Sequence, residues 1–151
     1  MPFLFAGDIF REKQYFSVVK TPMKKETIEK IKDILSRHSS IDYAFIFGSI
    51  LSKPLKESDV DILLGASLDT KERIGLAMEL ELFLKRKVDM VLVREASCEL
   101  VLNAFSKGLP VFIKDKSRLK EDYFRNSHLY DDNTILRRFR ISRIKRKYGY
   151  A

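Results

Sequence analysis

Cysteine is almost absent from this chain, which has only Cys98 among its 151 residues. A single cysteine forms neither an internal disulfide nor a thiolate metal site. This usage is typical of proteins that work in a reducing compartment. We therefore expect a cytoplasmic protein.

Long hydrophobic runs are also missing. The longest, Tyr43–Phe47 and Val91–Val93, are far shorter than the ~20 residues that span a bilayer. The apolar start, Phe3–Gly7, lacks the basic lead-in and the length of a signal peptide. We expect no membrane association. Hydrophobic residues nevertheless make up 45% of the chain and charged residues 33%, which is enough for a packed core and excludes a fully disordered or fibrous protein.

The positive charge of the chain is concentrated in one segment. The net charge is +8, from 29 basic and 21 acidic residues. Residues 137–147 contain seven basic residues and no acidic one, and without these seven charges the net charge falls to +1. Such a segment binds RNA, binds an acidic protein surface, or remains a solvated helix end. The candidate binding residues are Arg137, Arg138, Arg140 and Arg143.

The hydrophobic periodicity predicts alternating helices and strands. The predicted helices are Pro22–His38 with Thr21 as N-cap, Asp69–Lys85, Ser97–Lys107, and a helical region from Ser117 onward that breaks near Asp131–Asn133. The predicted strands are Asp42–Phe47, Ser58–Leu64, Lys87–Val93 and Leu109–Lys114. In the second helix, the apolar side is assigned to Ile74, Ala77, Met78, Leu80 and Leu84.

This order of elements predicts an α/β (α+β) fold, with one small mixed sheet flanked by helices and a basic C-terminal helical tail. Three parts of the chain are distinguished. Residues 1–22 form an N-terminal arm or strand, residues 23–115 form the main domain, and residues 116–151 form the basic helical extension.

Three aspartates are the most informative residues of the main domain. Asp59 and Asp61 lie two positions apart on a predicted strand, so their carboxylates project to the same side while Val60 points into the core. Asp89 lies in an otherwise apolar strand, where an uncompensated carboxylate is costly. If the two strands are neighbours, the three carboxylates share one site. Grouped carboxylates need a cation to stay ionised, and oxygen ligands suit Mg²⁺ or Mn²⁺.

Gly48 and Ser49 follow the first predicted strand. A glycine at a strand end lets a ligand approach the backbone N–H groups, and the neighbouring hydroxyl can donate to a phosphate oxygen. Lys53 in the following loop can neutralise negative charge. Each feature alone is commonly only a turn, but their order along the chain favours a functional site.

On these motifs the sequence resembles the minimal nucleotidyltransferases of the DNA polymerase β-like superfamily. The matching segments are FIFGS at 45–49, SDVDILL at 58–64 and VDMVLV at 88–93. The resemblance covers roughly residues 28–114 and implies the nucleotidyltransferase fold for the main domain. It also implies transfer of a nucleoside monophosphate from an NTP to an acceptor hydroxyl, with release of pyrophosphate.

The resemblance assigns roles to the site residues. It implies that Asp59 and Asp61 hold two Mg²⁺ ions, that Gly48 and Ser49 bind the β/γ-phosphates, and that Asp89 completes the site and helps to deprotonate the acceptor. ATP or another NTP is the implied substrate. Family members commonly continue Gly-Ser with x-Ala-Arg-Gly, whereas this chain has Ile-Leu-Ser-Lys at 50–53. Lys53 is expected to take part of the arginine's role, without its bidentate geometry.

Many small relatives are MntA-type antitoxins, encoded beside a HEPN-domain RNase toxin that they inactivate by adding AMP to a tyrosine. The resemblance therefore implies a protein adenylyltransferase and antitoxin, with a HEPN-type toxin as partner. The alternative is a non-catalytic antitoxin, or an RNA- or protein-binding module with a degenerate site, that acts through the basic tail. A homo-oligomer is compatible with both interpretations.

Overall fold

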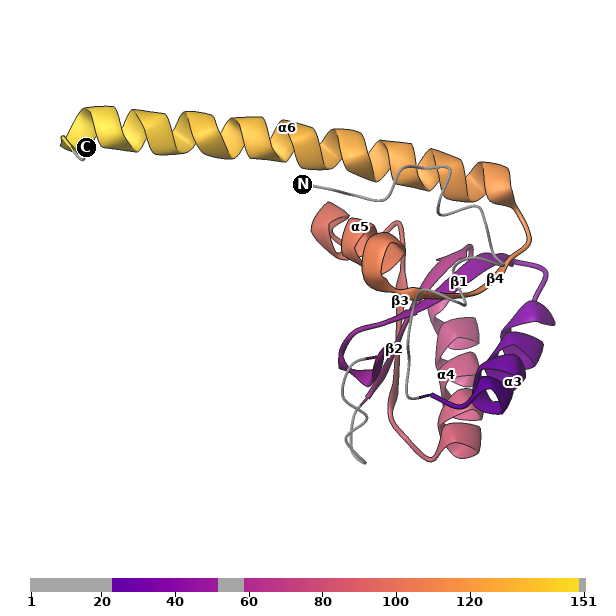
Figure 1. The fold of residues 1–151 in the computed structure, drawn as a ribbon. Coiled ribbons are helices and arrows are strands. Elements are labelled where there is room, and N and C mark those ends of the chain that lie inside the picture. Colours follow the sequence, from indigo (N-terminus) through magenta and orange to yellow (C-terminus); the bar gives the residue numbers. More distant parts are fainter. Residues whose placement is uncertain (1–22, 52–58, 150–151) are drawn as a thin grey trace.

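The computed structural model of this chain describes residues 23–51 and 59–149 (Figure 1). The N-terminal segment of residues 1–22, predicted to be an arm or strand, lies outside the described residues. Lys53 of the predicted site also lies outside them. The elements are, in order, α3 (Lys25–Ser36), β1 (Ile41–Phe47), the 3₁₀ turn η1 (Ser49–Leu51), β2 (Val60–Ala66), α4 (Thr70–Leu84), β3 (Val88–Leu92), α5 (Cys98–Lys107), β4 (Leu109–Ile113) and α6 (Lys116–Tyr148).

The four strands form one mixed sheet, as predicted, in the order β3-β2-β1-β4. β1 lies in the centre and pairs antiparallel with both β2 and β4. β2 and β3 are parallel, with α4 as the crossover between them. Parallel neighbours need such a connection, whereas a short link suffices for the antiparallel pair.

The sheet separates two layers of helices (Figure 1). α3 and α4 cover one face, called here the α3/α4 face, and α5 and the first part of α6 cover the other, called the α5/α6 face. Because side chains alternate along a strand, successive residues of β2 serve different layers. Ile62 and Leu64 pack on the α3/α4 face, and Leu63 packs on the α5/α6 face.

Local signals set the helix ends. Asp69 is the N-cap of α4, one of the two caps that the sequence allows, the other being Thr70. It forms a capping box in which its carboxylate accepts from the Glu72 N–H at 2.7 Å and its own N–H donates to the Glu72 carboxylate at 3.2 Å. Ser97 caps α5 by accepting from the N–H of Leu100. The predicted start of the first helix at Pro22 is wrong, because α3 begins at Lys25 with Lys24 as N-cap.

α6 is one continuous helix of 33 residues, about 50 Å long at 1.5 Å per residue. The predicted break near Asp131–Asn133 is wrong. Asn133 donates through Nδ2 to Sγ of Cys98 at 3.5 Å, and the Thr134 hydroxyl donates to the Tyr130 carbonyl, so these polar side chains find partners without leaving the helix. Neither α6 nor another helix in the described part of the chain is long and apolar enough to cross a membrane.

A buried carboxylate anchors the first part of α6 to the sheet. The Tyr43 hydroxyl on β1 donates to Oδ2 of Asp122 at 2.6 Å. The guanidinium groups of Arg118 and Arg125 pair with the same carboxylate, at 3.2 and 2.8 Å. Asp122 is only 1% exposed, so these three donors offset the cost of burying its charge. Burial and the hydrogen bond to Asp122 raise the pKa of Tyr43, which keeps its hydroxyl protonated as a donor.

Candidate active site

The predicted carboxylates lie at one edge of the sheet, where β1 ends and where β2 and β3 begin. In the parallel register Asp61 is directly opposite Asp89, and in the antiparallel register Asp61 is opposite Phe47. Asp59 immediately precedes β2. Asp61 and Asp89 alternate with residues of the α3/α4 core, so both face the α5/α6 side of the sheet. The predicted proximity of the two aspartate-bearing strands is confirmed.

The carboxylates repel one another. The pKa of Asp61 is raised, first by partial burial and then by the negative charges of Asp89 and Asp59. Asp59 and Asp89 themselves are exposed. Within residues 23–51 and 59–149, no group of three acidic, histidine or cysteine side chains converges closely enough to form a ready metal cage. The three aspartates therefore share one strand end and one electrostatic field without meeting at a single point.

Gly48 makes room for the central carboxylate. Its φ is +87°, in the left-handed region, and a Cβ at this position would lie 2.6 Å from Oδ2 of Asp61. A side chain here would strain the backbone and displace the carboxylate. Sequence reasoning assigned Gly48 to ligand access and missed this second role, which depends on the register that places Phe47 beside Asp61.

Ser49 opens the η1 turn that follows, and it is exposed. The Leu51 N–H donates to the Gly48 carbonyl at 3.2 Å, which closes the turn. Ile50 is 2% exposed and packs into the core of the α3/α4 face, so it fixes the turn to the domain. The turn is therefore held from one face of the sheet and presents its polar residues at the strand end.

The described residues fit a divalent cation. The donor set consists of carboxylates, which suits Mg²⁺ or Mn²⁺ better than a metal that prefers imidazole or thiolate. Burial raises the pKa of Asp61 first, and the negative charges of Asp89 and Asp59 raise it further; a cation among the aspartates would relieve this repulsion. Because glycine has no Cβ, position 48 leaves room for Oδ2 of Asp61 where the carboxylate lies.

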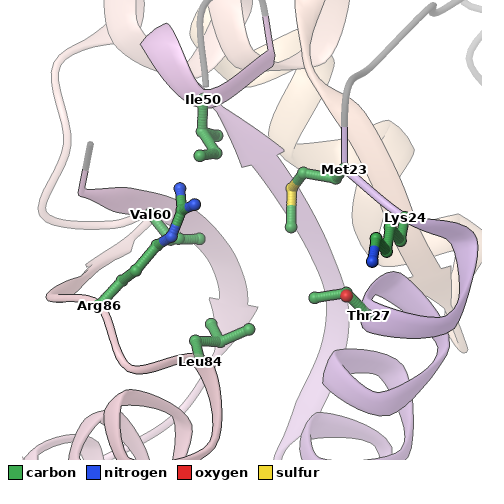
Figure 2. Close-up of a pocket in the computed structure, with 7 residues that line it drawn as sticks. All are labelled: Met23, Lys24, Thr27, Ile50, Val60, Leu84 and Arg86. Carbon is green, nitrogen blue, oxygen red and sulfur yellow. The ribbon is translucent and has the colours of Figure 1, made fainter. Parts of the chain in front are cut away.

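A pocket of about 320 Å³ lies behind this edge, on the other face of the sheet (Figure 2). Val60, which lies between the two aspartates in the sequence, lines this pocket. Its side chain packs in the core of the α3/α4 face, away from the carboxylates. Figure 2 shows Lys24 and Arg86 on opposite sides of the hollow. Of the predicted site residues within the described ranges, none lines this pocket, so we distinguish it from the carboxylate site.

Comparison with known families identifies the class of protein. The sequence model described as "Polymerase beta, Nucleotidyltransferase" matches residues 29–117. The match spans more than half of the chain and includes β1, β2 and β3, and therefore Gly48 and the three aspartates of the candidate site. The chain therefore belongs to the polymerase β nucleotidyltransferase family, as its motifs indicate. A comparison with curated protein sequences finds no significant match.

Solved structures with the same fold come from toxin–antitoxin complexes. A chain of the MntA-HepT toxin–antitoxin structure is 22% identical, with a TM-score of 0.64, over 80% of this chain and 98% of its own length. A chain of a toxin–antitoxin structure with AMP-PNP is 22% identical, with a TM-score of 0.63, over 81% of this chain and 98% of its own length. A chain of the structure of a tri-AMPylated Shewanella oneidensis HEPN toxin in complex with MNT antitoxin is 21% identical, with a TM-score of 0.61. The match covers 81% of this chain and 98% of that chain. At these identities the likeness establishes the fold, and it confirms the predicted nucleotidyltransferase architecture.

Proposed function

We propose that this protein is an Mg²⁺-dependent nucleotidyltransferase that transfers AMP from ATP to a hydroxyl of a HEPN-type toxin and thereby acts as its antitoxin. The observation that carries the proposal is the pairing of Asp61 with Asp89 beside Gly48, inside the segment that matches the family. The choice of ATP and of a HEPN partner draws on the similar structures, one solved with AMP-PNP and one containing an AMPylated HEPN toxin.

The residues have separable roles in this reaction. Asp59 and Asp61 would hold the metal ions, which supply charge neutralisation at the triphosphate when bound. Gly48 and Ser49 lie at the turn where backbone and hydroxyl donors can bind phosphate oxygens. Asp89 accepts the proton of the acceptor hydroxyl while that oxygen bonds to the α-phosphorus and pyrophosphate leaves. We also assign phosphate binding to Lys53, and this assignment rests on the sequence motif alone.

Radiolabel transfer tests this proposal. The full chain is incubated with MgCl₂, the product of the neighbouring gene as candidate acceptor, and ATP labelled at either the α- or the γ-phosphate. We expect label on the acceptor from α-labelled ATP and none from γ-labelled ATP, since AMP and not the terminal phosphate is transferred.

Variants of the site make this experiment specific. We expect Asp59→Asn and Asp61→Asn each to abolish transfer while the circular dichroism spectrum stays unchanged. Asp33→Asn removes the same charge from an exposed position on α3 and serves as the matched control. Full transfer by both site variants would mean that the carboxylates are wrongly assigned.

The exposed basic part of α6 supports a second candidate, a non-catalytic antitoxin or RNA-binding module. All residues from Ile135 to Lys147 are exposed, including the four predicted binding arginines. Calorimetric titration with each NTP and Mg²⁺ separates the two candidates. Absence of nucleotide binding, together with partner or RNA binding that survives Asp59→Asn, would favour the binding module.

A further inference from the structure

The second part of α6 projects from the described domain and is exposed along its length. We define the arm as residues 135–147, which project beyond the sheet and its other helices (Figure 1). Its large apolar side chains are between 46% and 67% exposed, and they are Ile135, Leu136, Phe139, Ile141 and Ile144. Exposed apolar side chains gathered on one element mark an interaction surface. Most helices of this length draw their stability from packing, which the arm lacks here.

The charges of the arm indicate the chemistry of its partner. Arg137 makes a long ion pair with Glu99 at the start of α5, at 3.7 Å. Within the described part of the chain, Arg138, Arg140 and Arg143 make no ion pair. Guanidinium groups interleaved with apolar side chains complement a surface that has an apolar centre and an acidic rim.

The mixture of arginines and apolar side chains favours a protein partner over RNA or a second copy of this chain. RNA is bound by cationic grooves that also stack several aromatic rings on the bases, and Phe139 is the only aromatic residue of the arm. The four other exposed apolar side chains would gain little from a phosphate backbone. A second copy aligned along the arm would bring two sets of like charges together, which is repulsive.

The position of the arm relates it to the carboxylate site. Asp61 and Asp89 face the α5/α6 side of the sheet, and α6 belongs to that same layer. Figure 1 shows the arm running past the start of α5, where Arg137 pairs with Glu99, and α5 follows the end of β3, whereas the carboxylates lie where β2 and β3 begin. A protein bound along the arm is therefore held by the same layer of helices that the carboxylate face belongs to, at the other end of the strands.

From the exposed apolar side chains and the arginines of the arm we propose that it is a docking surface for the acidic, apolar-centred face of the protein acceptor. The identity of the bound protein as the acceptor rests on the proposed function above. The docking itself does not, because binding can be measured without nucleotide.

Charge reversal of the arm tests the proposal in the full-length protein. The arm variant carries Arg137→Glu, Arg138→Glu, Arg140→Glu and Arg143→Glu. The matched control carries the same four-fold change at exposed cations of the α3/α4 layer, Lys25→Glu, Lys32→Glu, Arg37→Glu and Lys71→Glu. A third variant, Phe139→Ser, removes apolar contact from the arm without changing its charge.

The probe is the product of the neighbouring gene, taken as the candidate HEPN-type acceptor, titrated without nucleotide and then used as acceptor. We expect the arm variant to raise the Kd and the KM for this protein roughly tenfold or more. Phe139→Ser is expected to act in the same direction. The control variant should leave both constants within about twofold, and Mg²⁺-ATP binding should be equal in all variants.

Several outcomes decide between docking, RNA binding and a catalytic role of the arm. Unchanged acceptor binding by the arm variant would overturn the proposal, as would absence of binding by the wild-type protein. Loss of single-stranded RNA binding with acceptor binding retained would replace the protein partner with RNA. Loss of Mg²⁺-ATP binding would place the arm in the nucleotide site instead. Arm-dependent binding without AMP transfer would refute the proposed function and leave the docking surface standing.

Discussion

The two faces of the sheet are built from different chemistry. The core of the α3/α4 face is aliphatic apart from Phe112, with Ile31, Leu35 and Leu80 among its fully buried members. The α5/α6 face combines aromatic rings with the buried carboxylate of Asp122, and its strand end carries the candidate active site. The first face is held together by non-directional burial, whereas the second depends on placed hydrogen bonds. Substitutions on the two faces should therefore fail in different ways.

The largest expected effect is on the α5/α6 face. Asp122→Ala leaves the Tyr43 hydroxyl and the guanidinium groups of Arg118 and Arg125 without their shared acceptor. Breaking a buried charge network of this kind costs about 3–5 kcal/mol of unfolding free energy. Urea denaturation followed by circular dichroism measures the loss. Asp132→Ala, at an exposed position of the same helix, should change the free energy by about 0.5 kcal/mol or less. Equal values for the two variants would show that the network does not anchor α6.

The α3/α4 face should respond to lost volume. Leu35 is 0% exposed, so Leu35→Ala removes buried methyl groups and leaves a cavity that costs about 2–5 kcal/mol. Leu82→Ala, at a position that is 81% exposed, should cost about 0.5 kcal/mol or less in the same denaturation experiment. Per folded molecule, neither variant should alter Mg²⁺-ATP binding. A weakened nucleotide Kd in Leu35→Ala would contradict the separation of the two faces.

Two glycines should respond to alanine with opposite signs. Gly48→Ala strains a positive φ and forces Asp61 aside, so we expect a loss of about 1–3 kcal/mol and weaker Mg²⁺-ATP binding. Gly75 lies in the interior of α4 with no atom close to an added Cβ, and Gly75→Ala should therefore stabilise by about 0.5–1 kcal/mol. Parallel thermal melts and nucleotide titrations of the two variants check both signs. Intact nucleotide binding in Gly48→Ala would remove this glycine from the site.

The strand pattern of the site was predictable because it is local. Alternation along a strand puts Asp61 on the face opposite to Val60, which lies in the core, and the helical crossover brings Asp89 alongside, whereas Asp59 precedes the strand. The caps at Asp69 and Ser97 are equally local, since each side chain bonds to a backbone N–H three residues on. A signal that spans three residues can be read from sequence without knowing the fold.

The predictions that failed concern contacts made at a distance. Ile74 and Met78 were assigned to the buried side of α4, but they are 54% and 58% exposed, and Leu76 is buried instead. Apolar residues occur all around α4, so periodicity cannot select the face that packs. Tyr43 and Asp122 are 79 residues apart in the chain, and no local pattern pairs them. The same contact holds the beginning of α6 against β1.

The smallest expected effect reverses the usual sign and tests the carboxylate site itself. In the absence of metal, the ionised carboxylate of Asp61 is repelled by Asp89 and Asp59, and Asp61→Asn removes this repulsion. The gain in unfolding free energy should be below about 1 kcal/mol, because the site is partly exposed and water screens the charges. Added NaCl should narrow the difference between the two proteins. MgCl₂ should raise the Tm of the wild-type protein more than that of the variant, since binding to the folded state stabilises by mass action. If the variant is less stable than the wild type at low salt without metal, Asp61 makes a stabilising contact that outweighs the repulsion. The need for a cation at this strand end would then lose its electrostatic basis.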